Sequence, residues 1–238
     1  EIYMGDWSSD VCSSDLAVPA GVTPLAMDLN GDGRDDLVWP SHAISGSGNW
    51  HFMLADPATG GFGGVQNSGV TNTRHDSAFV IEWDGDGRDD LIVPYNGSTW
   101  WVLRSNGVGL QAPFDTGISV QGDFWFADVD GDGRDDMVRA AGQACTNGPE
   151  YTNIYLRLNA GAAFGAETFG AQISDVCPHA IYPFGRAADK QRSGTRRPDF
   201  NGDGREDLVL KVATFESGRP VSSQTYMEIG RASCRERV

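Results

Sequence analysis

Acidic side chains recur at a fixed spacing in four nine-residue segments of this 238-residue chain: residues 28–36, 82–90, 128–136 and 199–207. In each segment, acidic or amide residues occupy positions 1, 3, 5 and 9, and glycine occupies positions 4 and 6. Oxygen ligands on a glycine-containing turn suit Ca²⁺, whereas a transition metal would favour His or Cys. One copy alone could be an ordinary surface turn. Four copies with the same residue columns predict four calcium-binding loops.

The predicted ligands are the side-chain oxygens of positions 1, 3, 5 and 9 and the backbone carbonyl of the arginine at position 7. Copy by copy they are Asp28, Asn30, Asp32, Arg34 and Asp36; Glu82, Asp84, Asp86, Arg88 and Asp90; Asp128, Asp130, Asp132, Arg134 and Asp136; and Asp199, Asn201, Asp203, Arg205 and Asp207. In the first copy, Gly31 and Gly33 permit the turn, and Asp35 is expected to face solvent. The guanidinium of Arg34 is expected to offset part of the acidic crowding. Glu82 replaces aspartate at position 1, and its longer side chain is expected to weaken or reshape the second site.

Position 12 of each copy argues against a helical calcium loop. A loop of the EF-hand kind needs a glutamate at position 12 and a helix on either side. This chain has Trp39, Val93, Arg139 and Leu210 there, so the bidentate carboxylate is missing. Aliphatic and β-branched residues follow position 9, and they predict a strand. We therefore expect the loops to lie in β-hairpins.

The chain between the loops repeats one order of elements, which indicates repeat architecture. In the second unit, a strand at 78–81 enters the loop, a strand at 90–93 leaves it, and an aromatic strand follows at 100–103. A glycine-rich turn at 107–110 then precedes a fourth strand. Four short antiparallel strands per repeat are typical of a β-propeller blade, and no window shows sustained helical periodicity. The sequence predicts an all-β fold of about four blades.

The pattern D-x-[DN]-G-D-G-R-x-D-[LM]-[IV], opened by Glu82 in one copy, resembles the FG-GAP or VCBS repeat family, as do Phe62-Gly63 and Phe164-Gly165. The resemblance covers nearly all of residues 17–227. It implies an integrin-α-like β-propeller with calcium in a hairpin loop, but one fold hosts many activities. Because such propellers close with about seven blades, four copies imply a partial ring with open edges. A looser likeness is to the propeller-like region of bacterial Rhs or YD-repeat toxin-like proteins.

Both ends of the chain differ in character from the rest. Residues 6–16 and 229–238 resemble translated sequencing adapters along their whole length. We therefore predict that residues 1–16 and 228–238 are adapter-derived and that the native segment, 17–227, belongs to a longer protein. Only Cys145 and Cys177 then remain, and the sequence leaves open whether they form a disulfide.

Charge and motifs narrow the classes of function. The net charge is −15, and the four loops hold 4, 5, 5 and 4 acidic residues against one arginine each. This local acidity favours cations and argues against nucleic acid as a partner. No apolar run is long enough to span a bilayer. The four histidines share no spacing, and no hydrolase, zinc-protease or P-loop motif occurs, so the chain is not expected to be an enzyme.

Two functions follow from these expectations. The first is a non-catalytic, calcium-binding propeller for adhesion, scaffolding or protein interaction in an exported bacterial protein, secreted or at the cell surface. The alternative is a carbohydrate-binding accessory domain of a polysaccharide-active enzyme, with an exposed tryptophan stacked on a sugar. Tryptophans that recur beside strands are Trp39, Trp83, Trp100, Trp101 and Trp125. Most are expected to pack between blades, and the sequence does not identify the protein or glycan partner.

Overall fold

The structure is a computed structural model that describes residues 18–42, 48–71, 78–95, 98–142, 151–174, 181–183, 199, 202–206, 210–216 and 219–222. Within these residues the chain is all-β, with every element a strand and no helix. The part of the chain that is described therefore offers no long apolar helix to cross a membrane. The proposed adapter segments, Cys145 and Cys177 lie outside the described residues, so their predictions stay predictions.

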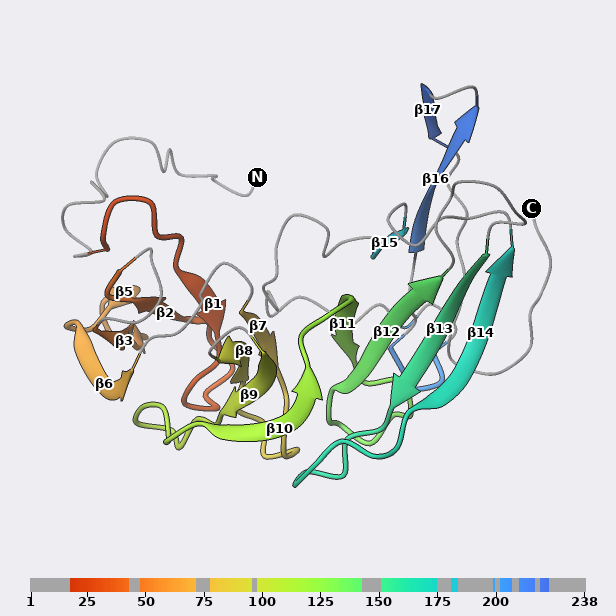
Figure 1. Cartoon of the computed structure of the whole chain (residues 1–238). Coiled ribbons are helices and arrows are strands. Elements are labelled where there is room, and N and C mark those ends of the chain that lie inside the picture. Colours follow the sequence, from red (N-terminus) through yellow and green to blue (C-terminus); the bar gives the residue numbers. More distant parts are fainter. Residues whose placement is uncertain are drawn as a thin grey trace.

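Three four-stranded antiparallel sheets follow one another along the chain (Figure 1). The first contains β1 (Leu25–Met27), β2 (Asp36–Pro40), β3 (Asn49–Met53) and β6 (Gln66–Thr71). The second contains β7 (Phe79–Ile81), β8 (Asp90–Tyr95), β9 (Thr99–Leu103) and β10 (Phe114–Ser119). The third contains β11 (Asp123–Ala127), β12 (Asp136–Gly142), β13 (Tyr151–Arg157) and β14 (Thr168–Ser174). In all three, each strand pairs with its neighbours in this order, which confirms the predicted four antiparallel strands per repeat.

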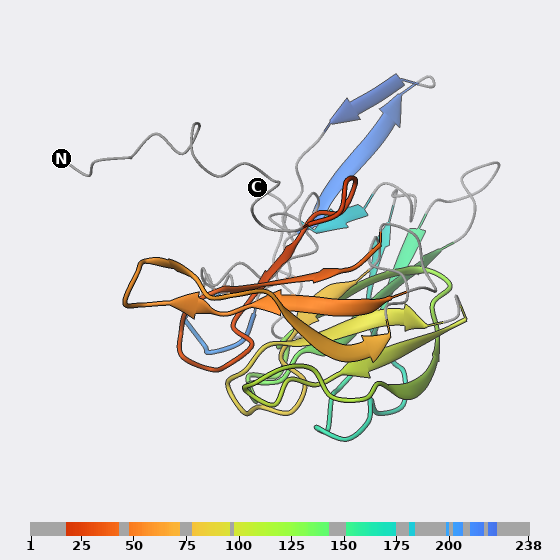
Figure 2. The ribbon, with the colours of Figure 1, turned by 90° about the vertical axis from the view of Figure 1, so that its left-hand side faces the viewer.

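Two smaller sheets complete the described structure. A two-stranded ribbon, β4 (Ala55–Asp56) and β5 (Gly61–Phe62), lies between β3 and β6 in the chain. A three-stranded sheet contains β15 (Ile181–Pro183), β16 (Leu210–Glu216) and β17 (Arg219–Ser222). Figures 1 and 2 both show the β16–β17 hairpin extending away from the three larger sheets. None of the sheets closes into a barrel within the described residues.

The three larger sheets are joined through their first strands and two apolar cores. Strand β7 contacts both β1 and β11, so the second sheet lies between the first and the third. Successive side chains of β8 therefore enter two different cores, because successive strand residues face opposite sides of a sheet. Leu91 and Val93 belong to the core shared with the first sheet, and Ile92 belongs to the core shared with the third. All three are fully buried, as expected for a strand covered on both faces.

Each of the first three acidic loops connects the first and second strands of its sheet. Position 9 of each loop is the first residue of a strand, as Asp36 is of β2, where it pairs with Met27 of β1. Position 12 lies inside a strand, at Trp39 in β2, Val93 in β8 and Arg139 in β12. The predicted β-hairpin setting is therefore confirmed for these three loops.

Candidate metal centres

The carboxylate at position 1 organises the backbone of the first loop. Asp28 Oδ1 accepts the N–H groups of Gly31 and Asp32 at 2.8 and 3.1 Å, and Oδ2 accepts that of Gly33 at 2.7 Å. Both glycines have positive φ, 77° and 81°, a region that glycine enters without steric cost. The loop thus wraps around the inward-pointing carboxylate of Asp28, as the repeated spacing of acidic residues and glycines predicts.

The third and fourth loops repeat these three bonds, and the second does not. Asp128 accepts N–H groups from Gly131, Asp132 and Gly133, and Asp199 accepts them from Gly202, Asp203 and Gly204, all at 2.7–3.1 Å. Glu82 accepts one such bond, from Gly85 at 3.0 Å. The longer glutamate side chain therefore holds its loop by a different arrangement.

The carboxylate at position 9 ties each loop to the end of the third strand. Asp36 Oδ2 accepts the Leu29 N–H at 3.0 Å, and Oδ1 accepts the Ala55 N–H at 2.7 Å. Asp90 makes the same pair of bonds with Trp83 and Ser105, and Asp136 makes them with Val129 and Asn159. All three aspartates are almost fully buried. Position 9 is a structural residue as well as a predicted ligand.

The arginine at position 7 pairs with the aspartate at position 5 of its own loop. Arg34 Nη2 lies 3.0 Å from Asp32 Oδ2. The pairs Arg88–Asp86 and Arg134–Asp132 repeat this contact. The guanidinium group therefore lies where it offsets acidic crowding, while the role assigned to the arginine carbonyl stays a prediction.

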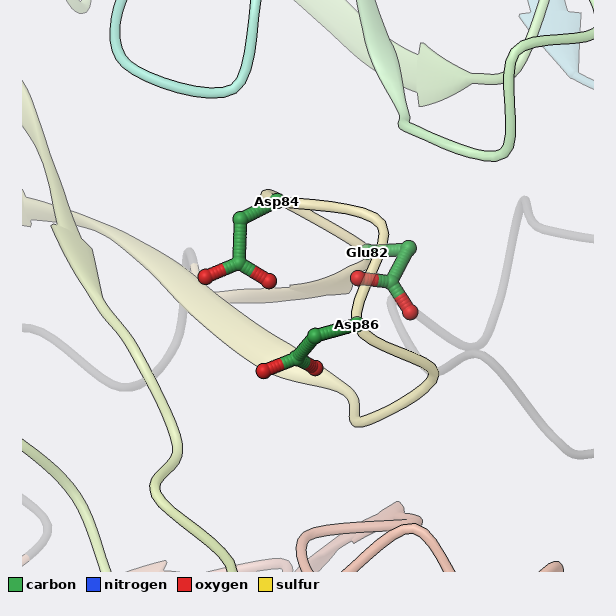
Figure 3. A group of neighbouring side chains, drawn as sticks. All are labelled: Glu82, Asp84 and Asp86. Atoms are coloured by element: carbon green, nitrogen blue, oxygen red, sulfur yellow. The ribbon is translucent and has the colours of Figure 1, made fainter.

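Two groups of carboxylates converge closely enough to share one metal ion. Figure 3 shows Glu82, Asp84 and Asp86, all from the loop between β7 and β8. Each offers an oxygen within 4.8 Å of the others, and the same is true of Asp128, Asp130 and Asp136. Ca²⁺ binds oxygens at about 2.3–2.6 Å, so two oxygens on one ion can lie up to about 5 Å apart. These acidic clusters could therefore hold a metal ion.

The clusters contain only part of each predicted ligand set. Asp90 is absent from the first cluster, and Asp132 is absent from the second. The first loop has an amide, Asn30, at position 3, and its Oδ1 accepts the Asp32 N–H at 2.9 Å. In the fourth loop, Asn201 and Asp207 lie outside the described residues.

Burial and mutual repulsion disfavour the charged form of the buried loop carboxylates. Burial, with the nearby charges of Asp84 and Glu82, raises the pKa of Asp90 to about 8. Burial, with the charges of Asp130 and Asp132, raises the pKa of Asp136 to about 7. A nearby positive charge would favour the ionised carboxylates, because opposite charges lower a carboxyl pKa.

The donor set at the second loop fits a hard divalent cation. All the clustered atoms are carboxylate oxygens, which Ca²⁺ prefers. Asp84 Oδ1 is buried and accepts no hydrogen bond in the described structure. A buried acceptor without a partner is costly, and coordination to a cation would satisfy it.

Position 8, which the ligand pattern leaves out, joins neighbouring loops. The Asp89 N–H donates to the Asp28 carbonyl at 2.8 Å, and the Asp28 N–H donates to Asp89 Oδ2 at 2.8 Å. The same reciprocal pair joins Asp135 with Glu82, at 2.7 and 2.9 Å, and Glu206 with Asp128, at 2.7 and 3.1 Å. We call this the position-8 contact. It places position 1 of one loop against the start of the second strand of the next repeat.

The exposure of position 8 changes along the chain. Asp35 is exposed, as expected, whereas Asp135 and Glu206 are buried by their contacts with the preceding loop. The sequence feature that could have revealed this role is the acidic residue at position 8 of all four copies. A solvent-facing position would not need to be acidic each time.

Glycine at position 4 also has an inter-repeat role. A Cβ atom at Gly31 would lie 3.0 Å from Cγ of Arg88, and one at Gly131 would lie 3.2 Å from Cγ of Arg205. The side chain at position 7 thus passes directly over position 4 of the preceding loop. Position 4 therefore needs glycine for close approach as well as for its positive φ.

Comparison with known proteins finds no matching family model and no match among curated proteins. Fold and site define the class of molecule: an all-β protein of repeated antiparallel sheets whose hairpin loops contain acidic clusters able to hold a metal ion.

Proposed function

We propose that the chain is a calcium-binding, non-catalytic β-propeller segment of the FG-GAP or VCBS type, with one ion per acidic loop. The observation that carries this proposal is the recurrence of one loop geometry, in which the position-1 carboxylate accepts three loop amides in the first, third and fourth copies. The buried carboxylates around it repel one another without a cation. Three sheets that follow one another with their first strands in contact support the blade arrangement.

The loop residues would hold the ion through oxygens that the backbone already orients. The position-1 carboxylate is fixed by loop amides, and the position-9 carboxylate is fixed by two strand-end amides. When bound, Ca²⁺ supplies positive charge that balances these acids. Because position 1 also takes part in the position-8 contact, a well-ordered loop would keep adjacent repeats aligned.

The proposed biological role is adhesion, scaffolding or protein interaction within an exported bacterial protein, secreted or at the cell surface, of the Rhs or toxin-like kind. Extracellular calcium is abundant enough for weak oxygen-ligand sites, whose dissociation constants reach about 10⁻⁴–10⁻³ M in extracellular modules. Apart from Asp84, the clustered carboxylates accept backbone N–H groups, and we propose that they act as metal ligands and not as general acids or bases. With binding as the proposed role, the partner of the chain would be a protein or a glycan.

The carbohydrate-binding alternative receives less support from the aromatic side chains. Among the tryptophans that the structure describes, Trp39, Trp50, Trp83, Trp100 and Trp125 are buried. Trp101 is half-buried, and its ring stacks on Tyr95 with centroids 4.4 Å apart. A sugar platform would need an exposed ring face, so we favour the scaffolding function.

Calorimetric titration of the metal-free chain with CaCl₂ tests the proposal. We expect uptake of more than one Ca²⁺ ion and much weaker binding of Mg²⁺, which dehydrates reluctantly and demands a more regular geometry. A variant with alanine at position 3 of every loop, in place of Asn30, Asp84, Asp130 and Asn201, removes one predicted ligand from each site and should lose most of the binding. Absence of calcium binding to the folded wild-type chain would refute the proposal.

A further inference from the structure

One position near the second metal centre differs from its counterparts in the other repeats. The residue after the third strand is Leu54 in the first repeat, Arg104 in the second and Leu158 in the third. Their equivalence is structural, because in each repeat the N–H of the next residue donates to the position-9 carboxylate. In each repeat the carbonyl of this residue also accepts an N–H from beyond the following turn. The second repeat therefore places a cation where the other two have an aliphatic side chain.

Arg104 reaches the acidic cluster of its own repeat. Its Nη1 lies 3.6 Å from Asp84 Oδ2, and its guanidinium carbon lies 6.0 Å from the centroid of the Phe114 ring. Asp84 is one of the three clustered carboxylates of the second loop. The Arg104 side chain is 40% exposed, so it can leave Asp84 for solvent without crossing the core.

We propose that Arg104 is an internal competitor of the divalent cation at the second loop and makes this loop the weakest of the calcium sites. The inference rests on the proposed calcium-binding function and adds a residue that sets the affinity of one site. A guanidinium and a divalent cation both need the Asp84 carboxylate, and their like charges repel at short range. Glu82 acts in the same direction: among the amides of the described loop residues 83–90 it accepts that of Gly85, whereas Asp28 and Asp128 each accept three amides of their loops.

A site-resolved measurement is possible because Trp83 occupies position 2 of the second loop. The first and third loops have Leu29 and Val129 at that position. Terbium luminescence sensitised by a neighbouring tryptophan therefore reports mainly on the second loop, and Trp83→Phe identifies that part of the signal. Displacement of Tb³⁺ by Ca²⁺ then yields the calcium affinity of the site.

The test compares the full wild-type chain with Arg104→Leu, which installs the residue found in the first and third repeats. We expect Ca²⁺ to bind the second loop about threefold to fivefold more tightly in the variant, the scale set by a partly exposed ion pair. Arg104→Lys, which keeps the positive charge, should stay near the wild-type affinity. Arg104→Gln should move in the same direction as Arg104→Leu, and circular dichroism verifies that each variant is folded.

Two outcomes separate this inference from the function on which it rests. If calcium binds the wild-type loops but Arg104→Leu and Arg104→Gln leave the second loop with unchanged or lower affinity, the competitor role is wrong and the calcium function stands. If neither the wild-type chain nor the folded variants bind Ca²⁺, both proposals fall.

Discussion

Single carboxylates in the loops have a structural role in addition to the ligand role that we propose for them. Asp36, Asp90 and Asp136 accept two backbone N–H groups each, so their orientation is set before any cation arrives. Each oxygen that accepts one N–H retains a further lone pair for a metal. Ligands fixed in this way lose little conformational entropy on binding. Substitutions at these positions would therefore lower both calcium affinity and stability, which makes position 3 the cleaner place to test affinity.

At position 3, Asp130→Ala should weaken calcium binding more than Asp84→Ala. The third loop has an aspartate at position 1 that accepts three amides, whereas the second loop begins with Glu82 and has Arg104 at its edge. We expect a loss of more than about tenfold for Asp130→Ala at its own site, because removal of one charged oxygen ligand costs more than about 1.4 kcal/mol. Competition with a chromophoric chelator measures both constants. Equal losses in the two variants would contradict the ranking.

An ion pair away from the loops predicts a pH dependence of stability. Arg139 Nε lies 2.9 Å from Glu167 Oε2, and this hydrogen bond, with the charge of Arg139, lowers the pKa of Glu167 below its ordinary value of 4.5. A lowered pKa stabilises the fold above the unfolded-state value, and this stabilisation disappears as pH falls through the folded-state pKa. Glu167→Gln should cost about 1 kcal/mol at pH 7.

Urea unfolding of wild type and Glu167→Gln at pH 7 and near pH 3 checks this prediction. The difference between their free energies of unfolding should shrink at the lower pH, because the ion pair loses the charge of Glu167 as pH falls through its lowered folded-state pKa. A difference that stays constant between the two pH values would show that the ion pair does not stabilise the fold.

Between elements, the position-8 contact predicts which side chain holds the second and third sheets together. Asp135 is fully buried and its Oδ2 accepts the Glu82 N–H at 2.9 Å, while its own N–H donates to the Glu82 carbonyl. Asp135→Ala removes a charged acceptor and should lower the free energy of unfolding by about 2 kcal/mol. Asp35→Ala, at the same position of the first loop, is the matched control and should lower it by less, because Asp35 is exposed and no described loop precedes it to form a position-8 contact.

Urea unfolding in the presence of EDTA measures this effect without a contribution from bound metal. Equal effects of Asp135→Ala and Asp35→Ala would mean that the position-8 contact contributes no more than an exposed acidic residue does.

The strands and the hairpin loops could be predicted from sequence because both depend on local chemistry. Aliphatic residues after position 9 predicted β2, β8 and β12, and the residues at position 12 excluded a helical calcium loop. The acidic residue at position 8 of every copy was a signal that this position has a role, but its partner could not be predicted, because the contact depends on how one repeat aligns with the next, over 53 residues between Glu82 and Asp135. Arg104 was missed for the same reason, since only the folded turn brings it to Asp84.

Across the whole molecule, the apolar cores favour close packing of adjacent repeats, whereas charge repulsion between the acidic loops opposes it. The cores between the sheets bury residues such as Trp50, Val93 and Phe126, which favours close packing of adjacent repeats. The same packing brings the acidic loops together through the position-8 contacts, on a chain of net charge −15. Repulsion among these loops offsets part of the stability that burial provides, so bound cations would act on the alignment of repeats as well as on each loop.

Thermal unfolding tests this coupling between metal and fold. A ligand that binds only the folded state at 100 times its dissociation constant adds about 2.7 kcal/mol of stability. For a chain of this size, 1 kcal/mol corresponds to about 2–4 °C in Tm. EDTA should therefore lower Tm by about 5–10 °C for each occupied site, relative to CaCl₂ at 100 times the dissociation constant that the titration measures, and added CaCl₂ should restore it. The variant with alanine at position 3 of every loop is the control, because its Tm should respond much less to EDTA than that of the wild type. A wild-type Tm that does not respond to EDTA or CaCl₂ would mean that the acidic loops stabilise this fold without calcium.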